Sequence, residues 1–168
     1  PVNREIFKSP KNTYRLNAST PLNLLTSHAM KYGLKGWDVF TGIPASLGGA
    51  IFMNAGTALG EIGSVVETVD VLDVQGQIYT HVCSEDSFYY RGNNFIKEGE
   101  IIVSANLKHF GINESVKSEI KDYLEYRKSS QPLASKNCGS VFKNYSASHR
   151  AGITIDSIGL KNFGVNNL

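Results

Sequence analysis

The chain has 168 residues, of which 41% are hydrophobic and 19% are charged, and its formal net charge is +2. A chain of this length can bury a core in one domain or two small ones, and its apolar content excludes a disordered chain. The near balance of 17 basic and 15 acidic residues gives no electrostatic field that favours nucleic acid.

Local patterns exclude two further classes. The longest apolar-leaning run, residues 39–60, is interrupted by glycines and a proline, so it predicts no membrane span. Cys83 and Cys138 have neither metal-ligand spacing nor the pattern of a disulfide framework, and the histidines are scattered, so no metal site is predicted. We therefore expect a protein of the reducing cytoplasm.

The first part of the chain predicts one helix and a glycine-rich segment. Residues 1–19 show no convincing period. Thr20 is expected to cap a helix that begins with Pro21 and ends at Gly33. Residues 34–63 are glycine-rich and apolar, and the run from Gly42 to Gly56 is expected to form a loop.

The middle of the chain predicts β-structure. Residues 65–74 and 78–83 are rich in β-branched side chains and flank Gln75-Gly76, which indicates a hairpin. Ser84, followed by two acidic residues, resembles the start of a short helix. Residues 101–108 alternate, which predicts a strand with one face exposed to water.

A second helix is expected after Asn113, which can cap it, and Gln131-Pro132 is expected to end it. Its buried stripe is predicted to hold Val116, Ile120, Tyr123 and Leu124. The composition then changes, so we expect a domain boundary near residues 129–132. Because the strands cluster and the helices flank them, the predicted fold class is α+β.

Three segments could carry chemistry, and each has a plain structural alternative. The first is the run of glycines from Gly42 to Gly56. Glycines let a backbone approach a ligand, and successive amides can bind an anion. The same glycines could instead allow tight packing of a buried turn, and the spacing fits neither a dinucleotide fingerprint nor a Walker loop.

The second segment is Tyr89-Tyr90-Arg91, where an arginine could clamp a carboxylate or phosphate. The alternative is a surface arginine lying over an aromatic ring. The third is residues 137–144, where Ser140 follows a glycine and Lys143 could hold an anion. No histidine is placed to activate Ser140, so a hydrolase is not indicated, and a strand with a glycine bulge remains the alternative.

Taken together, these segments resemble the MurB family of UDP-N-acetylenolpyruvoylglucosamine reductases. The matching positions are Gly33, Leu34, Gly36, Gly42, Ile43, Pro44, Gly48, Gly49, Ala50, Met53, Asn54, Ala55, Gly56, Tyr90, Arg91, Arg127, Gln131, Pro132, 139–144, Ala151, Gly152, Ile155, Asp156, Gly159, Leu160 and Lys161. The chain departs from the family pattern at Ala45, where glycine is usual, and at Asn93, where serine is usual.

The resemblance implies the second part of a vanillyl-alcohol-oxidase-type FAD-binding fold, in residues 1–130. The start of an α+β substrate-binding domain would follow in residues 131–168. It also implies a longer protein, because the family's upstream loop for the FAD pyrophosphate and its late catalytic glutamate have no counterpart in this sequence. We accordingly expect the 168-residue chain alone to be inactive.

The resemblance further implies that NADPH and FAD reduce the enolpyruvyl group of a UDP-sugar in peptidoglycan synthesis. Arg91 would stabilise the substrate carboxylate, and Ser140 would donate a proton. The cofactor-binding residues implied are Gly42, Ile43, Pro44, Ser46, Gly48, Gly49, Asn54, Ala55 and Gly56, and the substrate-binding ones are Tyr90, Gln131, Lys143 and Asn144. A different flavin oxidoreductase and a non-catalytic binding protein remain alternatives, although keeping both Arg91 and Ser140 favours the reductase.

Overall fold

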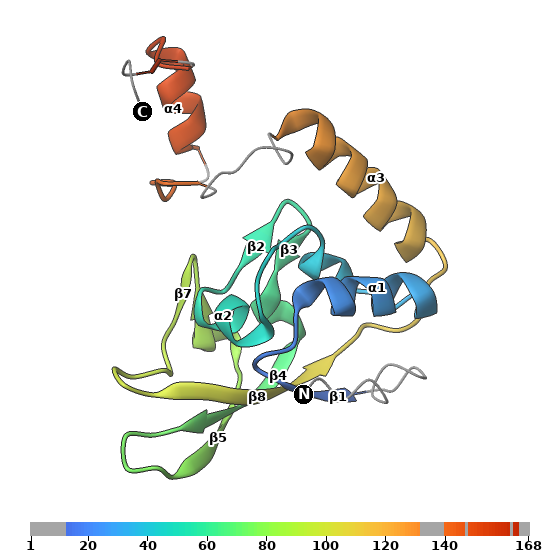
Figure 1. Ribbon diagram of the computed structural model, residues 1–168, viewed down its shortest axis with the longest axis vertical. Coiled ribbons are helices and arrows are strands. Elements are labelled where there is room, and N and C mark those ends of the chain that lie inside the picture. The colour runs from blue at the N-terminus through green and yellow to red at the C-terminus, as the bar shows by residue number, and fades with distance from the viewer. Residues whose placement is uncertain (1–12, 132–139, 147, 162, 165–168) are drawn as a thin grey trace. The chain divides into compact units, whose positions relative to one another are not determined.

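The computed structural model describes residues 13–131, 140–146, 148–161 and 163–164 (Figure 1). The chain divides into two compact units, Pro1–Ser130 and Gln131–Leu168. The assignment of these parts to a cofactor domain and a substrate domain stays a prediction.

The first unit is built on a four-stranded antiparallel sheet. The strand order is β1 (Thr13–Asn17), β8 (Ile101–Lys108), β4 (Val66–Leu72), β5 (Ile78–Val82) (Figure 1). The predicted hairpin is confirmed as β4 and β5, and Asp73 stabilises its turn by accepting hydrogen bonds from the backbone of Gln75 and Gln77. Strand β1 was not predicted, although its residues alternate between exposed and buried.

Strand β8 is confirmed, but its expected wet face is wrong at one position. Ser104 was assigned to water, yet it is 4% exposed because its hydroxyl donates to the Asp70 carboxylate at 2.6 Å. On the other face, Leu107 is buried whereas Ile101 is 59% exposed. The apolar face of β8 is therefore covered only along its second half.

Helices cover the inner face of the sheet. Helix α1 (Leu22–Tyr32) ends at Gly33, as predicted, where φ is +68° and the amide donates to the Ala29 carbonyl. Its N-cap is Pro21 rather than the predicted Thr20, and no side chain caps it. The 3₁₀ helix η2 (Trp37–Phe40) follows, and the Trp37 indole donates to the Lys108 carbonyl at the end of β8.

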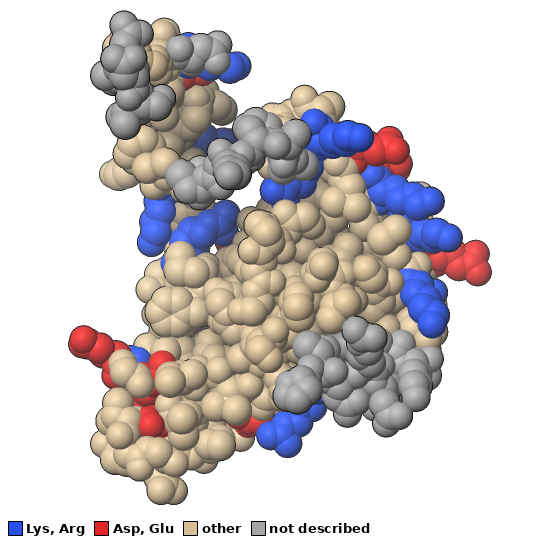
Figure 2. Space-filling model, viewed as in Figure 1, with Lys and Arg blue, Asp and Glu red and all other residues tan. Residues whose placement is uncertain are grey.

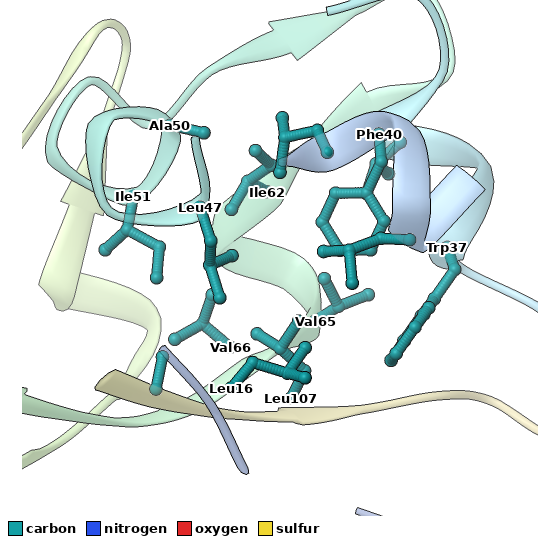
Figure 3. Close-up of a cluster of buried hydrophobic side chains, with 14 of the residues drawn as sticks. Leu16, Trp37, Phe40, Leu47, Ala50, Ile51, Ile62, Val65, Val66 and Leu107 are labelled. Atoms are coloured by element: carbon teal, nitrogen blue, oxygen red, sulfur yellow. The ribbon is translucent and has the colours of Figure 1, made fainter. Parts of the chain in front are cut away.

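The core lies between the sheet and these helices. Trp37 and Phe40 point into it from η2, and the sheet closes it from below (Figure 3). Its labelled members are Leu16, Trp37, Phe40, Leu47, Ala50, Ile51, Ile62, Val65, Val66 and Leu107, each at most 3% exposed.

The glycine-rich segment is not a loop throughout. It contains helix α2 (Leu47–Phe52), which begins at Ser46, and this corrects the prediction. The helix forms despite two glycines because Leu47, Ala50 and Ile51 are buried on one face. Short elements follow: β2 (Gly56–Thr57), β3 (Gly60–Glu61), the 3₁₀ helices η3 (Ile62–Val65) and η4 (Glu85–Ser87), and the hairpin β6 (Phe88–Tyr89) and β7 (Gly92–Asn93).

Helix α3 (Val116–Ser130) completes the first unit. Val116 and Ile120 are buried as predicted, but Leu124 is 38% exposed, so the buried stripe is shorter than expected. Side chains of both charges lie along this helix, which therefore presents no single-sign field (Figure 2).

The second unit contains helix α4 (Ala151–Ser157), in which no residue is buried. Among the described residues, no helix combines the length and apolar character that crossing a membrane requires.

Candidate functional site

The predicted cofactor-binding residues occupy one continuous path, from an exposed turn through α2 to β2. Gly42 forms the turn with φ of +71°, and Ser46 accepts a hydrogen bond from the Gly49 amide at the start of α2. Asn54 and Gly56 follow the end of the helix. The remaining predicted members, Ile43, Pro44, Gly48, Gly49 and Ala55, lie between these points.

Packing within the protein explains some of these glycines but not all of them. A Cβ on Gly48 would lie 2.7 Å from the Ala18 Cβ, and one on Gly56 would lie 2.8 Å from the Glu61 Cγ. A Cβ on Gly49 would meet only the Ser46 hydroxyl, at 3.4 Å. The structural alternative therefore accounts for Gly48 and Gly56, while Gly49 leaves accessible backbone that a ligand can approach.

Arg127 lies against the Gly42 turn, a contact that the residue pattern did not predict. Its guanidinium donates to the Thr41 carbonyl at 3.4 Å, and a Cβ on Gly42 would lie 2.7 Å from its Nη1 atom. Within the described part of the chain, the buried Thr41 hydroxyl has no hydrogen-bond partner. The turn thus combines a cation, an exposed glycine and an unsatisfied hydroxyl.

Arg91 occupies a strained turn between β6 and β7. Its φ is +61°, a left-handed conformation that costs a non-glycine residue about 1–2 kcal/mol. The guanidinium donates to the carbonyls of Asn54 at 3.5 Å and Gly56 at 3.2 Å, and it lies 4.8 Å from the centre of the Tyr90 ring. Across the described ranges no carboxylate forms an ion pair with it, so its charge is available to an anion.

Asn54 is the other described non-glycine residue with positive φ, at +39°, and it is buried. Its side-chain amide donates to Glu61 at 2.7 Å and to the Tyr89 carbonyl at 3.1 Å. Its side-chain oxygen accepts from the Gly63 amide at 3.0 Å. Strained residues persist where their surroundings hold them and tend to gather at functional sites, and here two of them are in contact.

The base of the Arg91 hairpin is held by aromatic and polar contacts. The His81 ring stacks on Phe95 with centroids 4.2 Å apart, and its Nε2 atom lies 3.0 Å from the Ser87 hydroxyl. Burial lowers the pKa of His81, which favours the neutral ring. Ser84 caps η4 as predicted, in a reciprocal pair with Ser87.

Asn93, one of the two positions at which the chain departs from the family pattern, connects this hairpin to α2. Its amide donates to the Phe52 carbonyl at 2.9 Å, and its oxygen accepts from the backbone of Phe95 and Ile96. The hairpin that carries Arg91 is therefore fixed to the end of the glycine-rich helix.

The remaining candidate residues belong to the second unit, which begins at Gln131. Ser140 and Lys143 are exposed, and Gln131 is exposed as well. Asn144 is half-buried, and its side-chain oxygen accepts from the Ala151 amide at the start of α4. Cys138 lies outside the described residues. Arg91 belongs to the first unit and Ser140 to the second, and the pairing of the two residues stays a prediction.

Cysteine and potential metal-ligating side chains are the remaining reactive groups that the structure describes. Cys83 is partly buried, and burial raises its pKa to about 11, which leaves it protonated at neutral pH. Among the described side chains, no group of three or more potential ligands is placed to hold a metal ion.

Comparison with known proteins identifies this architecture. No family model matches the sequence. A UDP-N-acetylenolpyruvoylglucosamine reductase of Heliobacterium modesticaldum is 38% identical over 145 residues, which are 86% of this chain and 46% of the relative. One from a Thermotoga species is 38% identical over 151 residues, covering 89% and 50%.

A solved structure agrees with these relatives. The crystal structure of the Thermus caldophilus enzyme, MurB, superimposes with a TM-score of 0.77 at 32% identity, over 92% of this chain and 56% of that one. The chain is similar to MurB over about nine tenths of its own length. It spans about half the length of the curated MurB relatives it matches. The predicted family and the predicted mixed helix-and-sheet fold are both confirmed.

Proposed function

We propose that this chain supplies part of the flavin site and part of the substrate site of a UDP-N-acetylenolpyruvoylglucosamine reductase. The reaction would be the NADPH-dependent reduction of the enolpyruvyl group to the lactyl ether of UDP-N-acetylmuramate, in peptidoglycan precursor synthesis in the cytoplasm. The names of its relatives support this reaction. The structural observation that supports the proposal is the Arg91 guanidinium, which is oriented by two carbonyls and has no ion pair among the described residues.

The glycine-rich path fits a bound FAD. Gly49 offers open backbone, and at the Gly42 turn the Arg127 guanidinium donates to the Thr41 carbonyl. The hydroxyl of Thr41 is buried and has no hydrogen-bond partner among the described residues. An anionic and partly flat cofactor would suit these features. FAD, once reduced by NADPH, would supply the hydride for the enolpyruvyl double bond. The residues proposed to hold it are Gly42, Ile43, Pro44, Ser46, Gly48, Gly49, Asn54, Ala55 and Gly56.

Arg91 is proposed to bind the carboxylate of the enolpyruvyl group. A planar guanidinium can donate two parallel hydrogen bonds to a carboxylate, and its fixed charge stabilises negative charge that develops there during reduction. Its contact with Tyr90 and with two carbonyls limits its rotation, so less ordering is needed when the substrate binds.

Ser140 is proposed to donate the proton that completes the reduction. A hydroxyl is a weak acid, so it can protonate only a strongly basic carbon, such as the one generated next to the carboxylate. Its exposed position in the described unit allows a substrate to approach. Tyr90, Gln131, Lys143 and Asn144 are proposed to contact the nucleotide sugar.

The function is tested with the full-length protein that contains this chain. The purified protein should carry flavin absorbance and should oxidise NADPH in the presence of UDP-N-acetylenolpyruvoylglucosamine. It should not do so with UDP-N-acetylglucosamine, which lacks the carboxylate and the double bond. A protein that retains flavin but reduces a different acceptor would support the other oxidoreductase instead.

The role of Ser140 is tested by separating the two halves of the reaction. Ser140→Ala should leave the reduction of the flavin by NADPH within about twofold of wild type and slow its reoxidation by the substrate at least about 1,000-fold, comparable to the loss of a general acid. Ser118→Ala, on the exposed face of α3, is the matched control. Equal loss of both half-reactions, with flavin retained, would contradict the role.

A further inference from the structure

We propose that Glu61 is a positioning residue for Arg91 and sets the direction of its guanidinium through Asn54 and Gly56. The inference rests on the proposed function, because it concerns the cation that the proposal places at the substrate carboxylate. It extends that function to a residue whose sequence context gave no indication of a role.

The hydrogen bonds that direct the Arg91 guanidinium go to backbone carbonyls, and the Tyr90 ring adds a contact with its carbon atom. Its Nη1 atom donates to the Asn54 carbonyl and its Nη2 atom to the Gly56 carbonyl, at 3.5 and 3.2 Å. Both acceptors belong to the short stretch that leaves α2 and enters β2. A shift of this backbone would therefore turn the guanidinium.

Glu61 contacts both residues whose carbonyls accept hydrogen bonds from Arg91, namely Asn54 and Gly56. Its side-chain Oε2 atom accepts from the Asn54 amide at 2.7 Å, and its backbone pairs with Gly56 between β2 and β3. A Cβ on Gly56 would lie only 2.8 Å from the Glu61 Cγ, so the two residues are in close contact. One residue thus supports the backbone on which both hydrogen bonds of Arg91 depend.

The carboxylate also determines the orientation of the Asn54 amide. A carboxylate is an acceptor only, so it must face the NH₂ group, and the Gly63 amide is a donor, so it must face the oxygen. The second N–H then reaches the Tyr89 carbonyl in the hairpin that carries Arg91. This arrangement holds Asn54 at its positive φ, which it would leave if the amide lost its partners.

Glu61 does not act as a counter-ion. No ion pair between it and Arg91 occurs within the described residues, and its short contact is with the neutral amide of Asn54. The negative charge is therefore used as a strong acceptor beside the site, while the guanidinium keeps its charge for the ligand.

The test measures binding of two nucleotides to the oxidised full-length protein by calorimetry. UDP-N-acetylenolpyruvoylglucosamine carries the carboxylate, and UDP-N-acetylglucosamine does not. Glu61→Leu should weaken binding of the first at least about tenfold and change binding of the second by less than about twofold. Glu61→Gln retains an acceptor for the Asn54 amide and should keep both affinities within about threefold of wild type.

Glu67, half-buried on β4, provides the matched controls Glu67→Leu and Glu67→Gln, which should bind both nucleotides like wild type. Thermal melting identifies any variant that is merely unstable. If Glu61→Leu does not fold, Asn54→Gly replaces it, because glycine accepts positive φ but lacks the amide, and the same selective loss is expected.

The inference is overturned if Glu61→Leu, or Asn54→Gly in its place, weakens the binding of both nucleotides equally or of neither. Failure of the proposed function gives a different result, and the comparison of wild type with Arg91→Met, made first, reveals it. In that case wild type and Arg91→Met would bind the two nucleotides with the same relative affinity, and the role of Glu61 would fail with it.

Discussion

Replacing Asp70 by alanine should destabilise the first unit by about 2–3 kcal/mol at pH 7. The Asp70 carboxylate accepts hydrogen bonds from Ser104 at 2.6 Å, Thr80 at 2.7 Å and Arg15 at 2.8 Å. The three partners lie on β8, β5 and β1, and Asp70 itself lies on β4, so one carboxylate connects all four strands of the sheet.

The magnitude follows from what each partner loses. The Ser104 hydroxyl is buried, and leaving it without an acceptor costs about 1–3 kcal/mol. Thr80 is exposed and can bind water instead. The Arg15 side chain is 71% exposed, so its ion pair contributes at most about 1 kcal/mol.

Urea unfolding of wild type and variants measures this loss. Asp70→Ala/Ser104→Ala should be no less stable than Asp70→Ala, since no buried hydroxyl is then left unpaired. Asp122→Ala, on the exposed surface of α3, is the control. An Asp70→Ala variant within about 0.5 kcal/mol of wild type would refute the reasoning.

The same network predicts a pH dependence. Hydrogen bonds from Ser104 and Thr80, with a smaller effect of Arg15, lower the pKa of Asp70 below its ordinary value of 3.8. A carboxyl with a lowered folded-state pKa stabilises the protein above the unfolded-state value, and this stabilisation is lost as the pH falls through the folded-state pKa. The difference between wild type and Asp70→Ala should therefore shrink below about pH 4.

Two further outcomes are expected. Gly48→Ala should lower the free energy of unfolding by about 1–3 kcal/mol because its Cβ would collide with Ala18, whereas Gly49→Ala should be near neutral in the same urea titration; equal effects would contradict the packing argument. Cys83, with a pKa raised to about 11, should resist iodoacetamide at pH 8 in the folded protein and react once urea unfolds it, as followed by mass spectrometry; rapid alkylation in the folded state would be inconsistent with its burial.

The elements that the sequence predicted are those whose pattern is local. The pattern on either side of Gln75-Gly76 predicts the hairpin of β4 and β5. The end of α1 is also a local feature, because Gly33 adopts the positive φ that ends a helix. Strand β1 was missed because its alternation covers only Thr13–Asn17 and its partner lies far along the chain, at β8.

Helix α2 and the Asn54 network were missed for a related reason. Glycine lowers helix propensity, so residues 47–52 form a helix only because the core buries one of its faces. The family resemblance predicted roles for Arg91 and Asn54. Nothing in the sequence around Glu61, which lies between Gly60 and Ile62, predicted a role for it. Its role depends on the fold that brings it to Asn54.

The position of β8 in the sheet has a consequence for synthesis of the protein. It is the last strand of the sheet in sequence but pairs with both β1 and β4, so these two strands cannot be joined until residues 101–108 have been translated. Until then, among the four strands of this sheet, β4 and β5 can pair with each other, while the backbone groups of β1 that bond to β8 have no partner strand. Contacts so distant in sequence slow folding, and strand edges that stay unpaired in the meantime favour aggregation.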